Sequence, residues 1–402
     1  MIRYFNPGHE TAVLNASKYY QPKANQLKMQ KELAFLPAWY AFPSDFILID
    51  KPLPNTFLSD LDLLNPIAQA ITTSDLTNKK SDLADLAIDL WGISPQSIYF
   101  FEKLNLFHHL EWQIPLWKEE LRLLGSRFTS HKILSFLIDT IPEIENEILP
   151  RFFSNLDELE KQVVHSSKEQ IVKSPYSSSG RGLVWLPPKK LAQSERQILS
   201  GMLKRQSQVS LEKVLDKQLD FSMHFEIDKA GKTLFTGYSV FQTNSKGVYE
   251  KSFLANQEEL EKKITFYIAP DLLLRVKIRL IQLIGKIFAP HYTGNIGVDM
   301  LVYSSENQYY LHPCVEINMR KSMGFLALRL FENYISHCSK GEFFVNYCSK
   351  RSEIYEKHKE WKKSDPVVTE NGKIKSGYLS LCPVEEDSEY WTGIKVKMDV
   401  SR

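Results

Sequence analysis

The middle of the chain consists of long apolar runs that are grouped around turn residues and separated by helical segments. Six extended runs are visible: IVK, GLVWL, FSMHFEID, LFTGYSVFQ, GVDMLVY and YYLHPCVEINM. Helices are predicted between them at 191–204 and 270–287, and Ala269-Pro270-Asp271 is a typical start for the second. Strands grouped into hairpins with intervening helices favour an α+β fold over a doubly wound parallel sheet.

The first 125 residues have a different pattern, in which short apolar runs alternate with helical patterns, so we expect a small α/β domain. Three runs have the length of buried strands: IRYF (2–5), FILI (46–49) and SIYFF (97–101). Helical patterns cover 25–36, 82–91 and 104–124. In the second of these, Asp82, Asp85 and Asp89 share one helical face, which favours a solvated face over a carboxylate site. The first strand ends at Asn6-Pro7-Gly8, so His9 and Glu10 follow at a strand's carboxyl end, where open α/β sheets bind ligands.

Composition and charge exclude several classes of protein. Hydrophobic residues make up 43% of the 402 residues and charged residues 24%, which is typical of a folded globular protein. The net charge of +2 provides no field to hold a nucleic acid, and the absence of a long uncharged apolar run predicts no membrane insertion. The four cysteines show no CxxC pair and the N-terminus no export pattern, so a cytoplasmic protein is expected. The sequence carries no signature of the oligomeric state.

The segment 171–186, IVKSPYSSSGRGLVWL, is a candidate phosphate-binding loop, because the usual GxxxxGK[ST] and GxGxxG motifs are missing. A strand ends at Lys173, and a loop of small residues follows from Ser174 to Gly182. In such a loop, backbone N–H groups and the hydroxyls of Ser177-Ser178-Ser179-Gly180 can close over a triphosphate. A plain mobile hairpin turn is the alternative.

The hairpin GNIGVDMLVY…YYLHPCVEINMR is a candidate metal site. Asp299 lies on its first strand, and Glu316, Asn318 and Arg320 are spaced two apart on its second, so their side chains should emerge on one face. Two carboxylates and an amide oxygen suit Mg²⁺ that bridges phosphates, and a nearby Arg suits a transferred phosphoryl group. A solvated strand face is the alternative, although the apolar Val315 and Ile317 alternate with the polar set.

Together these blocks resemble the ATP-grasp superfamily of carboxylate-amine ligases. The resemblance rests on the order of the Lys-tipped strand with its loop, Glu212-Lys213-Val214-Leu215, Asp299 and Glu316-x-Asn318-x-Arg320, and it covers roughly 125–335. It implies two α+β subdomains that clasp ATP, preceded by the small α/β domain. The implied domains are 1–125 (N-terminal α/β), 126–206 (with the phosphate loop), 207–335 (with the metal site) and 336–402 (a C-terminal extension).

The resemblance also implies residues that bind the phosphates. Lys132, in SHKIL before the first helix of the grasp, resembles the first phosphate-contacting lysine, and Lys173 resembles the second. The loop 174–182 resembles the flexible lid over the nucleotide. A basic residue from the intervening hairpin often reaches the phosphates, and Lys251 is chosen over Lys246.

The remaining implied roles concern the nucleoside, the metal and the transferred group. Glu212, Lys213 and Leu215 resemble the residues that read the adenine edge, and Asp220 falls where the superfamily places a ribose-binding group. Asp299, Glu316 and Asn318 resemble the magnesium ligands. Arg320 resembles the residue that steadies the γ-phosphate, so the implied catalytic residues are Arg320 and Lys173. The separation of Asp299 from Glu316 is long for the superfamily, which fits an extended hairpin with its turn at Ser304 to Gln308.

The function implied is an ADP-forming ligase with ATP and Mg²⁺ as cofactors and small-molecule carboxylate and amine substrates. Transfer of the γ-phosphoryl group to a carboxylate would give an acyl phosphate that an amine or similar nucleophile attacks. An ATP-dependent small-molecule kinase and a non-catalytic nucleotide-binding protein are the alternatives. The segment 320–324 leads into a predicted helix, where it either holds the acceptor's carboxylate or is a plain helix cap.

Overall fold

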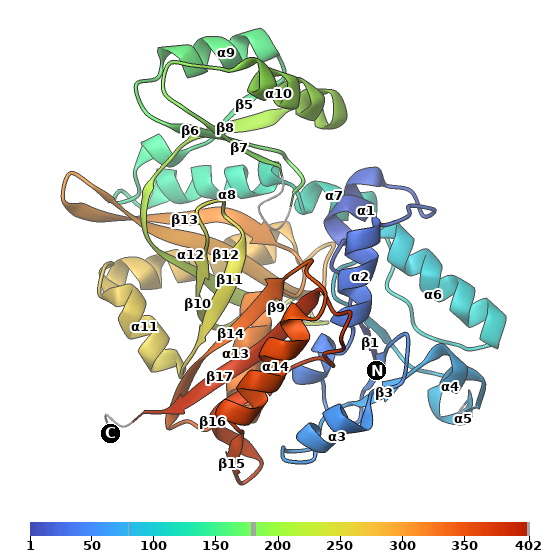
Figure 1. The fold of residues 1–402 in the computed structure, drawn as a ribbon. Coiled ribbons are helices and arrows are strands. Elements are labelled where there is room, and N and C mark those ends of the chain that lie inside the picture. The colour runs from blue at the N-terminus through green and yellow to red at the C-terminus, as the bar shows by residue number, and fades with distance from the viewer. Residues whose placement is uncertain (79, 178–181, 400–402) are drawn as a thin grey trace. The chain divides into compact units, whose positions relative to one another are not determined.

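The computed structural model describes residues 1–78, 80–177 and 182–399, which form two compact units. Unit 1 comprises residues 1–117, 250–260 and 320–402, and unit 2 comprises residues 118–249 and 261–319 (Figure 1). Each unit therefore draws on segments that are distant in the sequence. Among the described residues, no helix combines the length and the apolar character needed to cross a membrane.

Unit 1 begins with the predicted α/β part, a four-stranded parallel sheet in the order β3-β2-β1-β4. The strands are β1 (Ile2–Tyr4), β2 (Phe46–Leu48), β3 (Gln69–Ile71) and β4 (Ile88–Leu90). The helices of this part are α1 (His9–Asn15), α2 (Ala24–Glu32), η1 (Leu36–Trp39), α3 (Asn55–Leu61), α4 (Thr73–Asn78), α5 (Lys80–Leu83) and α6 (Pro95–His108). The chain leaves β1 toward β2 on one side and returns as β4 on the other, so the carboxyl ends of β1 and β4 form a topological switch point.

Three local expectations for this part are wrong. The run 97–101 is helical, because Ser94 caps α6 and Pro95 occupies its first turn, and Ile98 and Phe101 then form a buried helical stripe. The 82–91 pattern is not a helix: α5 ends at Leu83, and Asp89 lies on β4, where it accepts hydrogen bonds from Arg3 and Lys321.

The third is the predicted helix at 104–124, which is interrupted between α6 and α7 (Glu119–Leu124). Pro115 lies in the gap, and proline disfavours helix both at its own position and at the residue before it.

The rest of unit 1 is an antiparallel sheet in the order β11-β14-β17-β16-β15. Its strands are β11 (Tyr249–Leu254), β14 (Ser339–Tyr347), β15 (Val368–Glu370), β16 (Lys373–Ser380) and β17 (Tyr390–Met398), and its helices are α13 (Met323–Tyr334) and α14 (Glu353–Ser364). The predicted turn at Asn371-Gly372 joins β15 to β16, and both residues have positive φ, as a tight hairpin requires.

Unit 2 contains a small antiparallel sheet in the order β5-β8-β6-β7. The strands are β5 (Arg151–Phe153), β6 (Gln170–Lys173), β7 (Leu183–Leu186) and β8 (Val209–Lys213). Helices α9 (Leu156–His165) and α10 (Gln193–Gln206) cover one face of this sheet (Figure 1). Leu159, Val172, Leu199 and Val209 are fully buried in the core between them.

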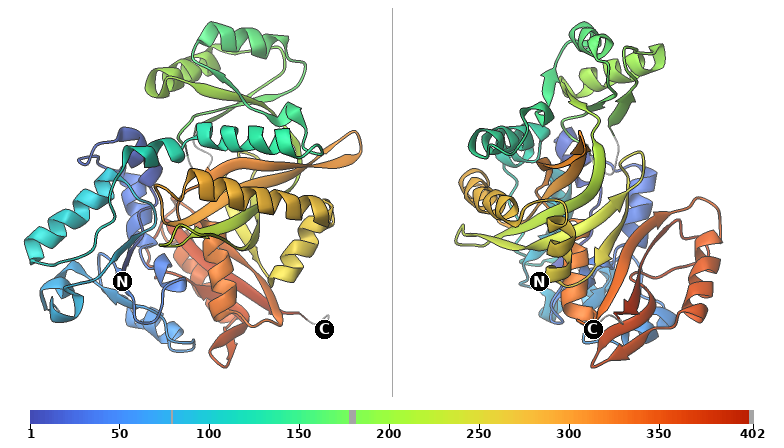
Figure 2. Two further views of the ribbon diagram at one scale, coloured as in Figure 1. Left: turned by 180° about the vertical axis from the view of Figure 1, so that it is seen from behind. Right: turned by 90° about the vertical axis from the view of Figure 1, so that its left-hand side faces the viewer.

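The second sheet of unit 2 runs in the order β13-β12-β9-β10. Its strands are β9 (Asp216–Ile227), β10 (Thr233–Thr243), β12 (Gly294–Ser305) and β13 (Gln308–Asn318). Helix α12 (Pro270–Ile287), with the bounds that the sequence predicts, packs along β10 and β9, and α8 (Arg127–Thr140) packs on β13 (Figure 2). The elements η2 (Asn146–Ile148) and α11 (Gln257–Thr265) complete the chain. The grouping of antiparallel strands with separate helices confirms the α+β prediction.

Candidate active site

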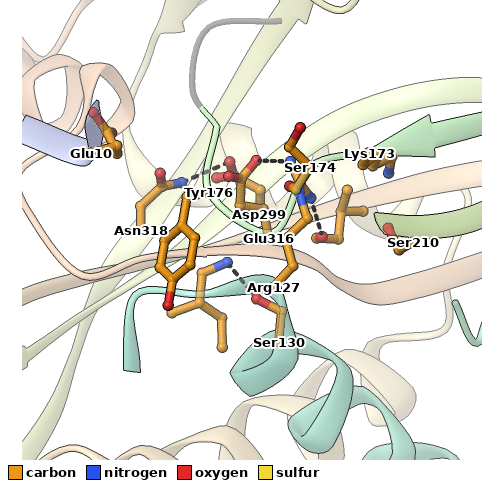
Figure 3. A network of polar contacts seen from close by, with 12 residues as sticks. Glu10, Arg127, Ser130, Lys173, Ser174, Tyr176, Ser210, Asp299, Glu316 and Asn318 are labelled. Atoms are coloured by element: carbon orange, nitrogen blue, oxygen red, sulfur yellow. Dashed lines mark hydrogen bonds and ion pairs between the residues drawn. The ribbon is translucent and has the colours of Figure 1, made fainter. Parts of the chain in front are cut away.

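The predicted metal ligands converge on one face of the β12–β13 hairpin. Asp299 lies directly opposite Glu316, and Gly297 lies opposite Asn318, so Asn318 emerges on the same face as the two carboxylates. The Asn318 side chain donates from Nδ2 to Asp299 Oδ2 at 2.8 Å (Figure 3). Ser222 Oγ donates to Asp299 Oδ1 at 2.6 Å. The long separation of Asp299 from Glu316 reflects long strands joined by a two-residue turn at Glu306-Asn307, as expected.

The donors in this set fit a hard cation that also takes ligands from a phosphate. Because the Asn318 amide nitrogen is bonded to Asp299, its carbonyl oxygen is left as an acceptor. Among the described residues, no group of three or more His, Cys, Asp or Glu side chains could hold a metal. A Mg²⁺ ion here would rely on two carboxylates, the amide oxygen and phosphate oxygens, which is usual for Mg²⁺.

Arg127, which was not among the residues predicted from the sequence, joins this set to the candidate phosphate loop. At the start of α8 it donates from Nη2 to Glu316 Oε2 at 3.0 Å and from Nε to the carbonyl oxygen of Ser174 at 3.1 Å (Figure 3). Its side chain is only 9% exposed. The sequence could have indicated Arg127 as a cation on the inner face of a helix, because Ser130 and Leu134 follow it at helical spacing. The structure buries all three residues.

Lys132 does not join this cluster. It lies inside α8 rather than before the helix, and its side chain is exposed beside the buried Ile133. Helix α8 starts at Arg127, and Gly125 and Ser126 separate it from the end of α7. The phosphate contact of Lys132 stays a prediction.

Lys173 and Glu212 form a buried ion pair across β6 and β8. Ile171 is opposite Glu212 and Lys173 opposite Ser210, so Lys173 and Glu212 are diagonal neighbours on one face. Lys173 Nζ is 2.5 Å from Glu212 Oε2, and Ser210 Oγ donates to Glu212 Oε1 at 3.1 Å. Burial alone would raise the pKa of Glu212, but the charges of Lys173 and Arg127 outweigh it and hold the pKa below its usual value.

His312 on β13 lies near this pair and is 3% exposed. Burial, which disfavours the charged imidazolium, lowers its pKa to about 4. The unfolded chain therefore binds a proton at this histidine between about pH 6.5 and pH 4, while the native state does not.

We predict that His312 destabilises the protein as the pH falls through this window, by about 3 kcal/mol at its lower end, because protons favour the unfolded state. Urea unfolding of the wild type and of His312→Asn at pH 7 and pH 4.5 checks this. The free energy of unfolding of the variant should fall less between the two pH values. Parallel losses in both proteins would contradict the prediction.

The ends of the predicted lid are fixed by hydrogen bonds. The backbone N–H of Ser174 donates to Gly182 O at 3.0 Å, and the Gln206 side chain bonds both the N–H and the carbonyl of Tyr176. Gly182 has a φ of 74°, and a Cβ there would lie 3.0 Å from Ser174 Oγ, so glycine is favoured at this point. Ser177 follows as a partly buried residue, whereas Ser178, Ser179 and Gly180 lie outside the described residues. The lid role stays a prediction.

The predicted nucleoside contacts lie along the β8–β9 connection. Lys213 pairs with Glu147, and Leu215 is half-buried between the two strands. Asp220 on β9 accepts from Thr243 Oγ1 at 2.9 Å and from Lys217 Nζ at 2.6 Å.

Two predicted phosphate contacts lie in unit 1. Lys251 on β11 donates to Glu342 Oε1 at 2.6 Å. Arg320 was expected on the same strand face as Glu316 and Asn318, but β13 ends at Asn318, and Arg320 Nε donates to Glu10 Oε1 at 2.5 Å. In the adjoining segment, Ser322 Oγ accepts from the backbone N–H of Phe325 and caps the start of α13.

No protein-family model and no curated protein match the sequence. Solved structures do match. A biotin carboxylase from Campylobacter jejuni in complex with β-γ-ATP is 10% identical with a TM-score of 0.51, over 99% of this chain and 87% of that one. An N5-carboxyaminoimidazole synthetase from Staphylococcus aureus is 13% identical with a TM-score of 0.50, over 99% of this chain and 92% of that one.

At this identity the likeness concerns the fold alone, and both structures are ATP-grasp enzymes. The chain therefore has the ATP-grasp fold, preceded by a small parallel-sheet part, which confirms the resemblance drawn from the sequence at the level of fold.

Proposed function

We propose that this protein is an ATP-dependent, ADP-forming ligase that activates a carboxylate as an acyl phosphate for attack by an amine or a similar nucleophile. One observation carries the proposal: the Arg127 guanidinium bonds both Glu316 and the carbonyl of Ser174. One arginine side chain in unit 2 therefore contacts both the candidate metal site and the start of the candidate phosphate loop. This pairing is what phosphoryl transfer requires, since charge neutralisation and positioning supply most of its catalysis.

Different residues of unit 2 would then bind the phosphates, the adenine and the ribose of the nucleotide. Lys173 and Arg127 would neutralise phosphate charge, together with the loop 174–182. Glu212, Lys213 and Leu215 would read the adenine edge and Asp220 the ribose. The phosphate contacts predicted for Lys251 and Lys132 remain part of the proposal. The predicted division of the chain into four domains also remains part of it.

Asp299, Glu316 and Asn318 would hold Mg²⁺. The bound ion would neutralise negative charge on the phosphate oxygens. Glu316 can serve a metal and still keep its bond to Arg127, because only its Oε2 is used by the guanidinium. Arg320 would steady the γ-phosphate.

The reaction needs no enzymic nucleophile. A carboxylate oxygen of the substrate attacks the γ-phosphorus, and the bond from that phosphorus to the bridging oxygen of ADP breaks. The amine then attacks the acyl carbon, phosphate leaves with the C–O electron pair, and the amine loses a proton. The enzyme positions the reactants and keeps water from the acyl phosphate.

ADP release measured against a panel of small carboxylates and amines tests the proposal. We expect release that requires one carboxylate and Mg²⁺, and formation of a hydroxamate when hydroxylamine replaces the amine. ADP release that depends on a hydroxyl compound, with no hydroxamate, would identify a kinase. The absence of ADP release across the panel, in a protein that binds Mg-ATP, would favour a non-catalytic binding protein.

A further inference from the structure

Residues 5–10, which form the loop after β1 and the start of α1, are fixed to the loop after β4 at the switch point of the parallel sheet. The Asn6 side chain forms two hydrogen bonds with the backbone of Gly92, from Nδ2 to Gly92 O at 2.7 Å and from Gly92 N to Oδ1 at 3.2 Å. The ring of His9 packs on Gly92 so closely that a Cβ there would lie 2.4 Å from His9 Cγ. A side chain at residue 92 would force this loop to move.

This anchoring places the carboxylate of Glu10 between two basic side chains. Glu10 Oε1 accepts from Arg320 Nε at 2.5 Å, and Oε2 lies 3.2 Å from His9 Nδ1. The side chains of Glu10 and Arg320 are only 18% and 17% exposed. Burial would raise the pKa of Glu10, but the charges of Arg320 and His9 outweigh it and hold the pKa well below its usual value, so Glu10 is ionised at neutral pH.

The residue after Arg320 is attached to the same end of the sheet. Lys321 donates from its backbone N–H to Trp91 O at 3.0 Å and from Nζ to Leu90 O at 2.9 Å, and it also bonds Asp89. Arg320 Nη1 in turn donates to the carbonyl of Lys321 at 3.0 Å. Lys321 therefore holds the backbone next to Arg320, and the Arg320 guanidinium bonds both Glu10 and the carbonyl of Lys321.

We infer that Glu10 is a positioning residue for Arg320, which it orients through the Nε–Oε1 hydrogen bond. The inference rests on the proposed function, in which Arg320 meets the γ-phosphate. An arginine has a long side chain with several rotatable bonds, and ordering it only when ligand binds would reduce the affinity.

The test compares the affinities of Mg-AMPPNP, which has a γ-phosphate, and Mg-ADP, which lacks one, by titration calorimetry. In Glu10→Ala the preference for Mg-AMPPNP over Mg-ADP should fall by about ten- to a hundredfold, with the affinity for Mg-ADP nearly unchanged. A role in general stability would instead weaken both ligands alike. Glu332→Gln is the matched control, because it removes the charge of an exposed Arg–Glu pair on α13 in the same unit.

A double-mutant cycle decides whether Glu10 acts through Arg320. In an Arg320→Ala background, adding Glu10→Ala should leave the preference unchanged, because the partner is already absent. A further fall would overturn the inference, and so would an unchanged preference in Glu10→Ala alone. If Glu10→Ala does not fold, Glu10→Met, which fills a similar volume without an acceptor for Arg320 Nε, serves in its place, and there too the preference must fall. Failure of the wild type to bind either nucleotide would instead reject the proposed function.

Discussion

Replacing Glu316 by Gln or Asn318 by Ala should leave the fold intact and lower ATP turnover at least about 10²-fold, the scale for losing one preorganised electrostatic group. Glu316→Gln keeps an oxygen for Arg127 but removes a charge from the cation site. Asn318→Ala removes an amide oxygen and the bond to Asp299. Turnover is measured as ADP release with the carboxylate that supports it, and the fold by circular dichroism.

Glu306→Gln is the control for this pair of variants, because it removes a carboxylate from the tip of the same hairpin, away from the candidate site. Its turnover should equal that of the wild type. Near-normal turnover in Glu316→Gln and Asn318→Ala would mean that this strand face is merely solvated, and the metal site would have to be abandoned.

Lys173→Met should destabilise the protein by about 3 kcal/mol and abolish nucleotide binding. The methionine leaves the carboxylate of Glu212 buried without its cation, and breaking one side of a buried ion pair is costly. Lys173→Met combined with Glu212→Gln should recover most of the stability, because the remaining buried groups are neutral, but it should not recover binding.

Urea denaturation of the wild type, the single variant and the double variant separates these two effects. A single variant as stable as the wild type would show that the ion pair contributes little to the native state. A stable double variant that binds Mg-ATP with wild-type affinity would remove Lys173 from the nucleotide site.

Long, strongly patterned elements could be predicted from the sequence. Helix α12 has the predicted bounds, because a proline in its first turn and a continuous apolar stripe both act within the segment itself. The β12–β13 hairpin, and the common face of Glu316 and Asn318, followed from the two-residue period of a strand.

Short elements were less predictable, because their state depends on partners that are distant in the sequence. Asp89 fits a helical pattern, yet its segment becomes β4 by pairing with β1. The apolar run 97–101 was compatible with either a strand or a helix. The N-cap at Ser94 favours the helix that the structure shows.

In the candidate site too, local sequence patterns predicted some residues, whereas contacts between residues distant in the sequence could not be predicted. The alternation in β13 gave Glu316 and Asn318, but it did not show that the strand ends at Asn318. Arg320 bonds Glu10, which is 310 residues away in the sequence, and no pattern around Arg320 indicates that contact. Arg127 was missed because its only signal is a cation on an apolar helical stripe, and its bond to Glu316 forms only when α8 packs on β13.

The change in melting temperature with Mg-ATP tests the central claim most directly, that unit 2 holds a magnesium-nucleotide site. Binding to the native state alone stabilises it by mass action, about 2.7 kcal/mol at a hundred times the Kd. We predict a clear rise for the wild type with millimolar Mg-ATP and none for the folded Lys173→Met/Glu212→Gln variant. A wild-type melting temperature that does not move with Mg-ATP would contradict the account.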